Sequence, residues 1–156
     1  ALCDGQTPIL GAANAVRRGE LYVGEIGKGA YCNGNPIRVS DETELNHVLM
    51  GVDSGKENRA AHIPFLLRAY QPDGIVCNIA MGCASVPLLL VASGVMHAYL
   101  ATSLEPEDMA AAVPIIREAG GKATNLAGEE WKLGDVSILA AHPVLHEKLG
   151  KFFGLF

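Results

Sequence analysis

Short apolar runs alternate with longer amphipathic segments along this chain of 156 residues. Runs that are rich in small or β-branched residues and bounded by glycine, proline or asparagine predict strands. The runs that fit this pattern are residues 8–16, 21–26, 36–39, 45–52, 75–80, 96–101, 122–126 and 136–141. Residues 17–20 and the Asn33-Gly34 pair have turn chemistry, so the first three runs are expected to form hairpins.

Apolar periodicity and typical helix-end residues predict helices over residues 58–70, 82–93, 106–119 and 143–153. Pro106 fits the first position of the third helix and Gly120 fits its end, whereas Pro114 inside it predicts a kink. No linker, repeat or low-complexity tract interrupts the alternation of strands and helices. The pattern therefore predicts an α/β fold in a single compact unit over residues 1–156.

Composition narrows the possible functions. Apolar residues make up 49% of the chain, and the net charge of −5 comes without any dense run of lysine or arginine. Neither a nucleic acid nor a membrane surface is therefore expected as a partner. The longest apolar run, residues 86–92, is too short to span a bilayer. The four cysteines have neither Cys-x-x-Cys nor zinc-like spacing, so we expect free thiols in a cytoplasmic protein.

The segment 105–121 carries the most informative chemistry. Glu105, Glu107 and Asp108 crowd the first turn of the helix expected to begin at Pro106. Carboxylates there complement the positive end of the helix dipole, which stabilises a helix by about 0.3–1 kcal/mol per residue. Taken alone, the cluster indicates only a helix start.

The same segment ends in Glu-Ala-Gly-Gly and resembles the inositol monophosphatase family of metal-dependent phosphatases. A Gly-x-Gly-Ala-x-x-Asn-Gly hairpin at 27–34 strengthens the resemblance, which extends over nearly the whole chain. In that family the aspartate at the position of Asp108 binds an active-site metal, so the resemblance implies that Asp108 is a Mg²⁺ ligand. It also implies the C-terminal half of the layered sugar-phosphatase fold, with a mixed sheet flanked by helices and a remnant of the first sheet.

Residues 82–84 are the second candidate site. A glycine turn between a strand and a helix either permits tight packing or leaves backbone N–H groups free for an anion or a hydroxyl. The resemblance implies substrate contacts at Gly82, Cys83 and Ala84, with Cys83 where a hydroxyl residue is usual. Ala101 stands where inositol-specific members have an acidic residue, and His97 departs from the family's Asp-Ala-Tyr. Fructose bisphosphate, histidinol phosphate and an adenosine bisphosphate therefore stay open as substrates beside inositol phosphates.

Three other features have simpler interpretations. His142 and His146 lie four residues apart without a glutamate between them, so they are interpreted as a surface pair rather than metal ligands. The glycine-rich stretch 24–29 lacks the Lys-Ser/Thr end of a phosphate-binding P-loop. Residues 53–56 either edge the active site or, in the simpler interpretation, form a solvated loop.

The resemblance thus predicts a Mg²⁺-dependent phosphomonoesterase that hydrolyses a small sugar or inositol-type phosphate and acts as a homodimer. The family's upstream glutamate and Asp-Pro-Ile-Asp-Gly-Thr motifs have no counterpart in this chain, so no catalytic base is assigned. We expect the chain to be inactive alone. The alternative is a catalytically inactive fragment or a non-enzymatic module that covers its sheet edge by self-association.

Overall fold

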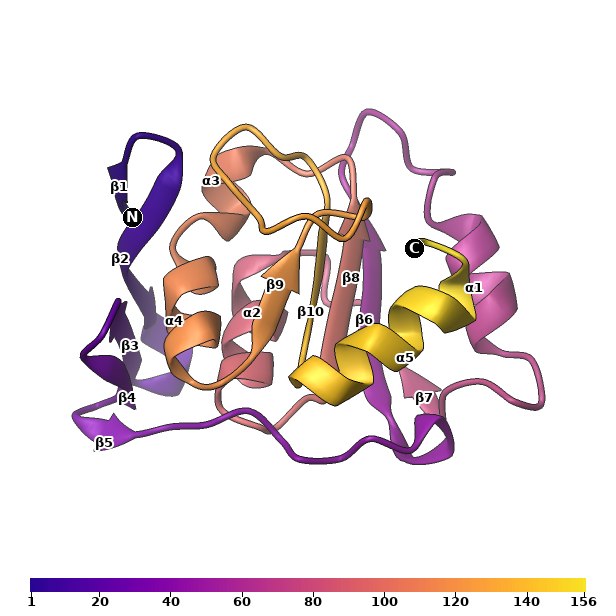
Figure 1. Cartoon of the computed structure of the whole chain (residues 1–156), viewed down its shortest axis with the longest axis horizontal. Helices are drawn as coiled ribbons and strands as arrows, with labels where there is room; N and C mark the ends of the chain where they lie inside the picture. Colours follow the sequence, from indigo (N-terminus) through magenta and orange to yellow (C-terminus); the bar gives the residue numbers. More distant parts are fainter.

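The computed structural model describes residues 1–156 as four layers, in which two sheets alternate with two helical layers (Figure 1). The first sheet is an antiparallel meander whose five strands lie in chain order. Its strands are β1 (Leu2–Asp4), β2 (Thr7–Ala15), β3 (Glu20–Glu25), β4 (Gly29–Cys32) and β5 (Asn35–Pro36). The 3₁₀ turn η1 (Val16–Arg18) connects β2 to β3, and Gly19 ends this turn with a φ of 66° that favours glycine. The hairpin expected between the runs 8–16 and 21–26 is confirmed. The turn at Asn33-Gly34 instead joins β5 to β4, and only Pro36 of the run expected over 36–39 lies in a strand.

The second sheet is mixed, with the strand order β7-β6-β8-β10-β9. Strand β6 runs parallel to β7 and β8, whereas β10 runs antiparallel to β8 and β9. The strands are β6 (Leu49–Ser54), β7 (Cys77–Asn78), β8 (Ala98–Thr102), β9 (Lys122–Thr124) and β10 (Ile138–Ala141). The expected α/β class and mixed sheet are therefore confirmed.

Helices cover both faces of the second sheet. They are α1 (Ile63–Ala69), α2 (Ser85–Ala92), α3 (Pro106–Met109), α4 (Ala112–Glu118) and α5 (Pro143–Phe153). Helices α2 and α4 fill the space between the two sheets, and α1 and α5 lie on the far side of the second sheet (Figure 1). In β8, Tyr99 and Ala101 join the core beside α2, whereas Ala98 and Leu100 join the core beneath α5. Burial on both faces explains the almost continuous apolar sequence of this central strand.

Several expected elements are shorter than the sequence pattern indicates. The strand expected over 45–52 begins at Leu49, because η2 (Leu45–His47) forms a 3₁₀ turn before it. The strand expected over 75–80 is reduced to β7. The helix expected from residue 58 begins at Ile63, with Pro64 in its first turn, where a missing N–H costs nothing.

The helix expected over 106–119 is interrupted rather than merely kinked. Helices α3 and α4 are separated at Ala110 and Ala111. Pro114 has no N–H to donate to the carbonyl of Ala110, so the hydrogen bond that would join the two helices is missing. Ala110 and Ala111 themselves keep right-handed helical backbone angles, so the interruption is a loss of hydrogen bonding between α3 and α4 and not an extended linker.

Helix α4 lies against the first sheet with no side chain between their backbones. A Cβ on Gly11 would lie 1.9 Å from the carbonyl oxygen of Ala111, and a Cβ on Gly24 would lie 2.6 Å from Cα of Ile115. Both sheet positions therefore require glycine. At the end of α4, the Glu118 carboxylate accepts hydrogen bonds from two backbone N–H groups of the β3–β4 hairpin, at 3.0 and 2.7 Å.

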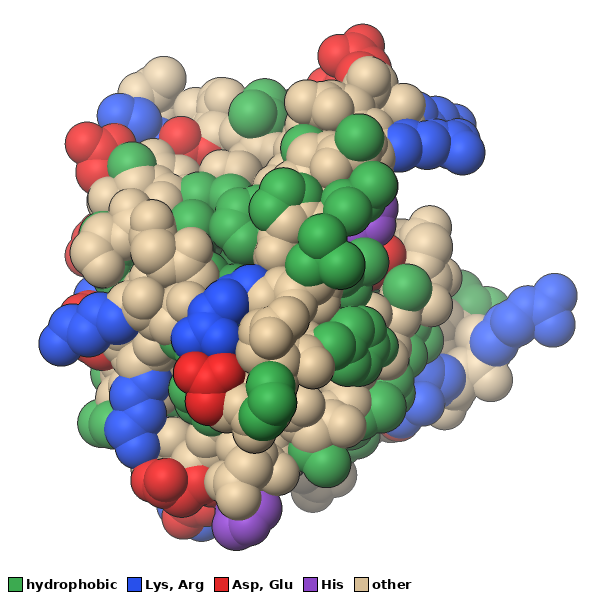
Figure 2. Space-filling view, turned by 90° about the vertical axis from the view of Figure 1, so that its right-hand side faces the viewer, with side chains coloured by type: hydrophobic (Ala, Val, Ile, Leu, Met, Phe, Trp, Pro, Cys, Tyr) green, Lys and Arg blue, Asp and Glu red, His purple; other side chains and the backbone are tan.

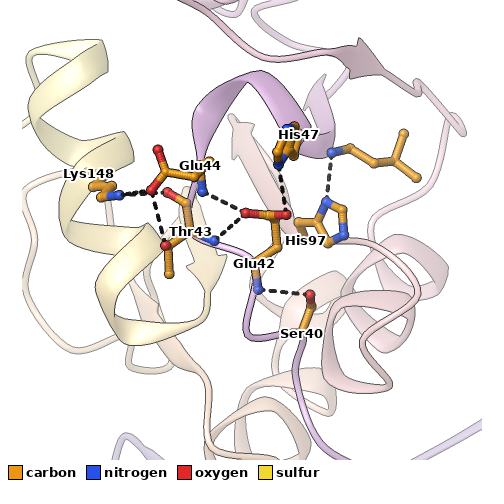
Figure 3. Close-up of polar contacts among 8 residues, drawn as sticks. Ser40, Glu42, Thr43, Glu44, His47, His97 and Lys148 are labelled. Carbon is orange, nitrogen blue, oxygen red and sulfur yellow. Dashed lines mark hydrogen bonds and ion pairs between the residues drawn. The ribbon is translucent and has the colours of Figure 1, made fainter.

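Polar contacts fasten the segment that joins the two sheets (Figure 3). Lys148 of α5 donates to the Glu44 carboxylate at 2.8 Å and to the backbone oxygen of Thr43 at 2.9 Å. Glu42 accepts from the backbone N–H groups of Thr43 and Glu44 at 2.8 Å each, and it pairs with His47 at 3.2 Å. The segment is thereby held against α5 just before β6 begins.

The interpretation of His142 and His146 as a surface pair is wrong. His146 is fully buried, where its Nε2 lies 2.8 Å from Oγ1 of Thr124 and its ring stacks on Phe156. His142 instead precedes α5 and accepts a hydrogen bond from the N–H of Val144 through Nδ1 at 3.3 Å. The second histidine faces the core because the apolar face of α5, which carries Leu145 and Leu149, packs on the sheet beside it.

None of the helices combines the length and the apolar character that a membrane span requires.

Burial of His146 predicts a loss of stability in acid. Burial is the largest cause that lowers its pKa to about 4, and the charge of Lys122 adds to the effect. The folded state therefore binds this proton less readily than the unfolded state, so stability is full above pH 6.5 and falls as the pH drops toward 4. We expect the free energy of unfolding to lose up to about 3 kcal/mol over this range from this group.

Denaturant unfolding at pH 7 and at pH 4.5 would measure this loss. His146→Gln keeps a polar partner for Thr124 but does not titrate, so its unfolding free energy should fall less than that of the wild type. Equal losses in the two proteins would show that His146 does not couple folding to pH.

Candidate active site

The carboxyl ends of the parallel strands β6 and β8 border a cavity of about 540 Å³. In open α/β sheets this edge is the usual place for a ligand. The starts of α2 and α3 form another side of the cavity. The lining residues are Asp53, Ser54, Gly55, Lys56, Glu57, Gly82, Cys83, Ala84, Ser85, Tyr99, Ser103, Leu104, Glu105 and Asp108. All four residues singled out from the sequence, Asp108 and Gly82 to Ala84, lie in this one cavity.

Asp108 lies on the first turn of α3 and is exposed. Pro106 occupies the start of the helix, and its fixed φ suits that position. The hydroxyl of Ser85 donates to the backbone oxygen of Asp108 at 3.0 Å, which joins the starts of α2 and α3. The carboxylate is therefore presented to the cavity from a backbone held at both helix starts.

The turn at Gly82 to Ala84 offers unused backbone donors. Gly82 has a φ of 68°, and a Cβ placed there would meet no atom within 4 Å, so backbone conformation rather than crowding favours glycine. None of the three backbone N–H groups has an acceptor within the chain. Ala84 is buried, whereas Gly82 and Cys83 are exposed at the cavity. Donors of this kind suit the oxygen atoms of an anion or a hydroxyl.

Asp53 lies in the cavity wall, so the simpler interpretation of 53–56 as a solvated loop is wrong and the alternative, a segment at the edge of the site, agrees with the structure. Its carboxylate is partly buried at the end of β6 and accepts a hydrogen bond from the hydroxyl of Tyr99 at 3.4 Å. Burial raises the pKa of Asp53, and the hydrogen bonds from Tyr99 and from the Met81 backbone partly offset this. Gly51 leaves room for the Tyr99 ring, since a Cβ there would lie 2.6 Å from Cδ2 of the ring.

The loop after Asp53 is pinned to the end of β8. The N–H of Gly55 donates to the carbonyl of Thr102 at 2.8 Å, and a Cβ on Gly55 would lie 1.5 Å from the carbonyl oxygen of Ser103. This close approach places the next residue, Lys56, at the cavity. From the sequence, Asp53 and Lys56 belong only to a segment that could edge the site, and their position directly after a buried strand is the signal that favours it.

Two substitutions noted in the sequence lie outside the cavity. Ala101 is fully buried in β8 and does not line the cavity. His97 precedes β8, at the end of the strand away from the cavity, and its Nδ1 accepts a hydrogen bond from the backbone N–H of Leu49 at 2.9 Å (Figure 3). His97 therefore supports the sheet and does not contact a ligand in the cavity.

The residues of this chain do not make a metal centre by themselves. No group of three or more histidine, cysteine, aspartate or glutamate side chains is close enough to hold an ion. A Mg²⁺ ion needs near-octahedral oxygen ligands, of which Asp108 offers one carboxylate. Asp108 alone therefore does not complete the coordination shell of a Mg²⁺ ion.

Comparison with known proteins assigns the chain to a family. Residues 1–153 match the inositol monophosphatase family. The chain belongs to that family. It therefore shares descent with phosphatases, and its layered α/β fold is the family's fold.

Individual relatives agree with the assignment to the inositol monophosphatase family. A fructose-1,6-bisphosphatase/inositol-1-monophosphatase of Aquifex aeolicus is 33% identical over 151 residues, which are 94% of this chain and 54% of the relative. A putative Nus factor SuhB of Neisseria meningitidis serogroup B is 34% identical over 132 residues, 83% of this chain and 50% of that protein. The crystal structure of extragenic suppressor protein suhB from Bartonella henselae superposes with a TM-score of 0.83 at 26% identity, covering 93% of this chain and 56% of that one. The chain thus spans about half the length of the curated relatives it matches.

The contact between Asp53 and Tyr99 predicts opposite effects for two substitutions. Asp53→Ala leaves the buried Tyr99 hydroxyl without an acceptor, so the free energy of unfolding should fall by about 1–3 kcal/mol. Asp53→Asn keeps an acceptor oxygen and removes a partly buried charge, so at pH 7 its stability should equal or exceed that of the wild type.

Denaturant unfolding of both variants, alone and combined with Tyr99→Phe, would check this. In the Tyr99→Phe background the cost of Asp53→Ala should shrink. If Asp53→Ala costs the same in both backgrounds, the hydrogen bond has no part in its effect.

Proposed function

We propose that this chain supplies part of the active site of a phosphomonoesterase that hydrolyses a sugar or inositol-type phosphate with Mg²⁺. The observation that carries the proposal is the cavity itself. It brings Asp108 at the start of α3 together with the unused amides of Gly82 to Ala84 before α2. The name of the Aquifex aeolicus relative joins a fructose bisphosphatase with an inositol monophosphatase, which supports both substrate types for the proposal.

The backbone amides of the Gly82 turn bind oxygen atoms of the substrate in this proposal. They have no acceptor within the chain and lie at a helix start, where the helix dipole favours negative charge. Asp108 contributes one ligand to Mg²⁺, and the remaining ligands and the catalytic base come from outside these residues. When bound, the metal would offset the phosphate charge and activate water.

The proposal places the enzyme in the cytoplasm. All four cysteines are free thiols, and Cys77 and Cys83 are exposed, which suits a reducing compartment. The chain has no dense basic run that would attract a nucleic acid or an anionic membrane, so its partner in the proposal is a small phosphate ester.

One observation favours the alternative, in which the chain is a non-enzymatic or inactive module. The described side chains contain no cluster of three metal-binding groups. The Neisseria meningitidis relative is named a putative Nus factor and not a phosphatase, which also supports this alternative. An activity measurement on the full-length protein separates the two candidates.

Asp108→Asn should sharply lower phosphatase activity in the full-length protein. The amide keeps the shape of the side chain but removes the charge that would bind Mg²⁺, so kcat/KM should fall about 100-fold or more. Phosphate release from fructose 1,6-bisphosphate and from inositol 1-phosphate, with Mg²⁺ varied, would measure the effect.

Glu107→Gln is the matched control, because it changes an exposed carboxylate on the same turn that does not line the cavity. Its activity should stay within about threefold of the wild type, as expected for a surface change. Activity in Asp108→Asn equal to that of the control would overturn the metal assignment. No Mg²⁺-dependent release from the wild type with either substrate would favour the non-enzymatic module.

We further propose that two copies of the chain pair through the apolar face of α1 and β7. Ile63, Leu67 and Tyr70 lie at i, i+4 and i+7 of α1 and are 48%, 65% and 62% exposed. Val76 and Ile79 beside β7 are also exposed. Figure 2 shows hydrophobic side chains gathered on this side of the molecule. Apolar patches of this kind are typical of contact surfaces.

Leu67→Glu tests the pairing, because it puts a charge in the middle of the apolar face. The wild type should sediment as a dimer and Leu67→Glu as a monomer, whereas Leu133→Glu, on a surface away from α1, should remain dimeric. A monomeric wild type, or a Leu67→Glu dimer, would exclude this interface.

A further inference from the structure

Lys56 is the one cationic side chain among the residues that line the cavity. It forms no ion pair or hydrogen bond within the chain, whereas Lys28, Lys122 and Lys148 are each paired with a glutamate. Its ammonium group is therefore available to a ligand. The function proposed above uses Asp108 and the Gly82 turn but gives this lysine no role.

The backbone that carries Lys56 is fixed rather than free. The N–H of Gly55 donates to the carbonyl of Thr102 at 2.8 Å. The two loops meet so closely that a Cβ on Gly55 would lie 1.5 Å from the carbonyl oxygen of Ser103. Asp53, three residues before Lys56, accepts a hydrogen bond from the hydroxyl of Tyr99. The backbone of Lys56 is thereby fixed at the cavity, and its flexible side chain is exposed there to a ligand.

The charges around Lys56 determine what it can select. Four carboxylates line the cavity, from Asp53, Glu57, Glu105 and Asp108, against this single ammonium group. An uncharged hydroxyl group of a substrate gains little binding energy from the ammonium, because water solvates the ammonium equally well. A second anionic group on the substrate, by contrast, is repelled by these carboxylates and attracted by Lys56, the one full positive charge among the lining residues.

We propose that Lys56 selects phosphate esters that carry a second anionic group, a further phosphate or a carboxylate. The inference rests on the proposed phosphatase function, and it adds the class of substrate. The ammonium donates charge-assisted hydrogen bonds to the second anion, while the reacting phosphate lies toward Asp108 and the Gly82 turn. A cavity of about 540 Å³ has room for such a bifunctional ester.

Full-length protein carrying Lys56→Met tests the proposal, because methionine keeps most of the apolar stem and removes the charge. The kcat/KM for fructose 1,6-bisphosphate, relative to that for fructose 1-phosphate, should fall about 10- to 100-fold, mostly through KM. Lys56→Arg should keep most of the preference. Lys132 also has no ion pair but lies outside the cavity, so Lys132→Met should leave the kcat/KM for both substrates unchanged.

Calorimetric titration with the non-hydrolysable phosphonate analogues of the two esters separates this inference from the proposed function. If neither ester is hydrolysed but Lys56→Met still weakens the binding of the bisphosphonate alone, the proposed activity fails and the role of Lys56 stands. If hydrolysis is seen and the ratio of the kcat/KM values for the two esters is the same in Lys56→Met as in the wild type, the activity stands and the inference is overturned. Equal losses for both esters also overturn it, because they indicate a general structural effect.

Discussion

The contact between α4 and the first sheet is the constraint on which the site depends. Gly11 and Gly24 let the helix backbone approach so closely that a methyl group at either position would collide with it. This packing fixes α4, and Pro114 within it interrupts the hydrogen bonds toward Ala110. Pro114 thus lies just after the boundary between the buried α4 and α3, whose first turn carries Asp108 at the cavity.

The second determinant of the site is the parallel pair β6 and β8. Parallel strands end at the same edge, so the loops after them are forced together. Gly55 makes this approach possible, and the Ser85 hydroxyl ties the start of α2 to α3 across the same space. Segments far apart in the sequence thus meet because of backbone contacts, and their functional side chains form few bonds to one another. Such a surface can be changed at Cys83 or Lys56 without loss of the fold.

Much of the fold follows from the sequence, since turn residues and apolar runs depend on local chemistry. The order of strands and helices, the hairpins and the interruption near Pro114 are all local. The location of Asp108 and Gly82 to Ala84 in one site came from the resemblance to a family, because helix-start carboxylates and glycine turns are common by themselves. His146 was misjudged because it lies near the start of a helix, whereas its burial is decided by contacts with Thr124 and Phe156. Asp53 and Lys56 were undervalued for a related reason: a short polar loop has no pattern that reveals which strand end lies beside it.

The charge of the cavity bears on how the proposed phosphate ester could bind. Four carboxylates face one ammonium group, so a phosphate dianion meets net repulsion unless further positive charge is supplied. The raised pKa of Asp53 reduces that repulsion only slightly near neutral pH, since an aspartate must be shifted far to be protonated there. The free amides before α2 supply dipoles but no full charge. Cations held jointly by Asp108 and by residues outside this chain would reverse the local field, and the same carboxylates that repel the substrate would then serve to hold them.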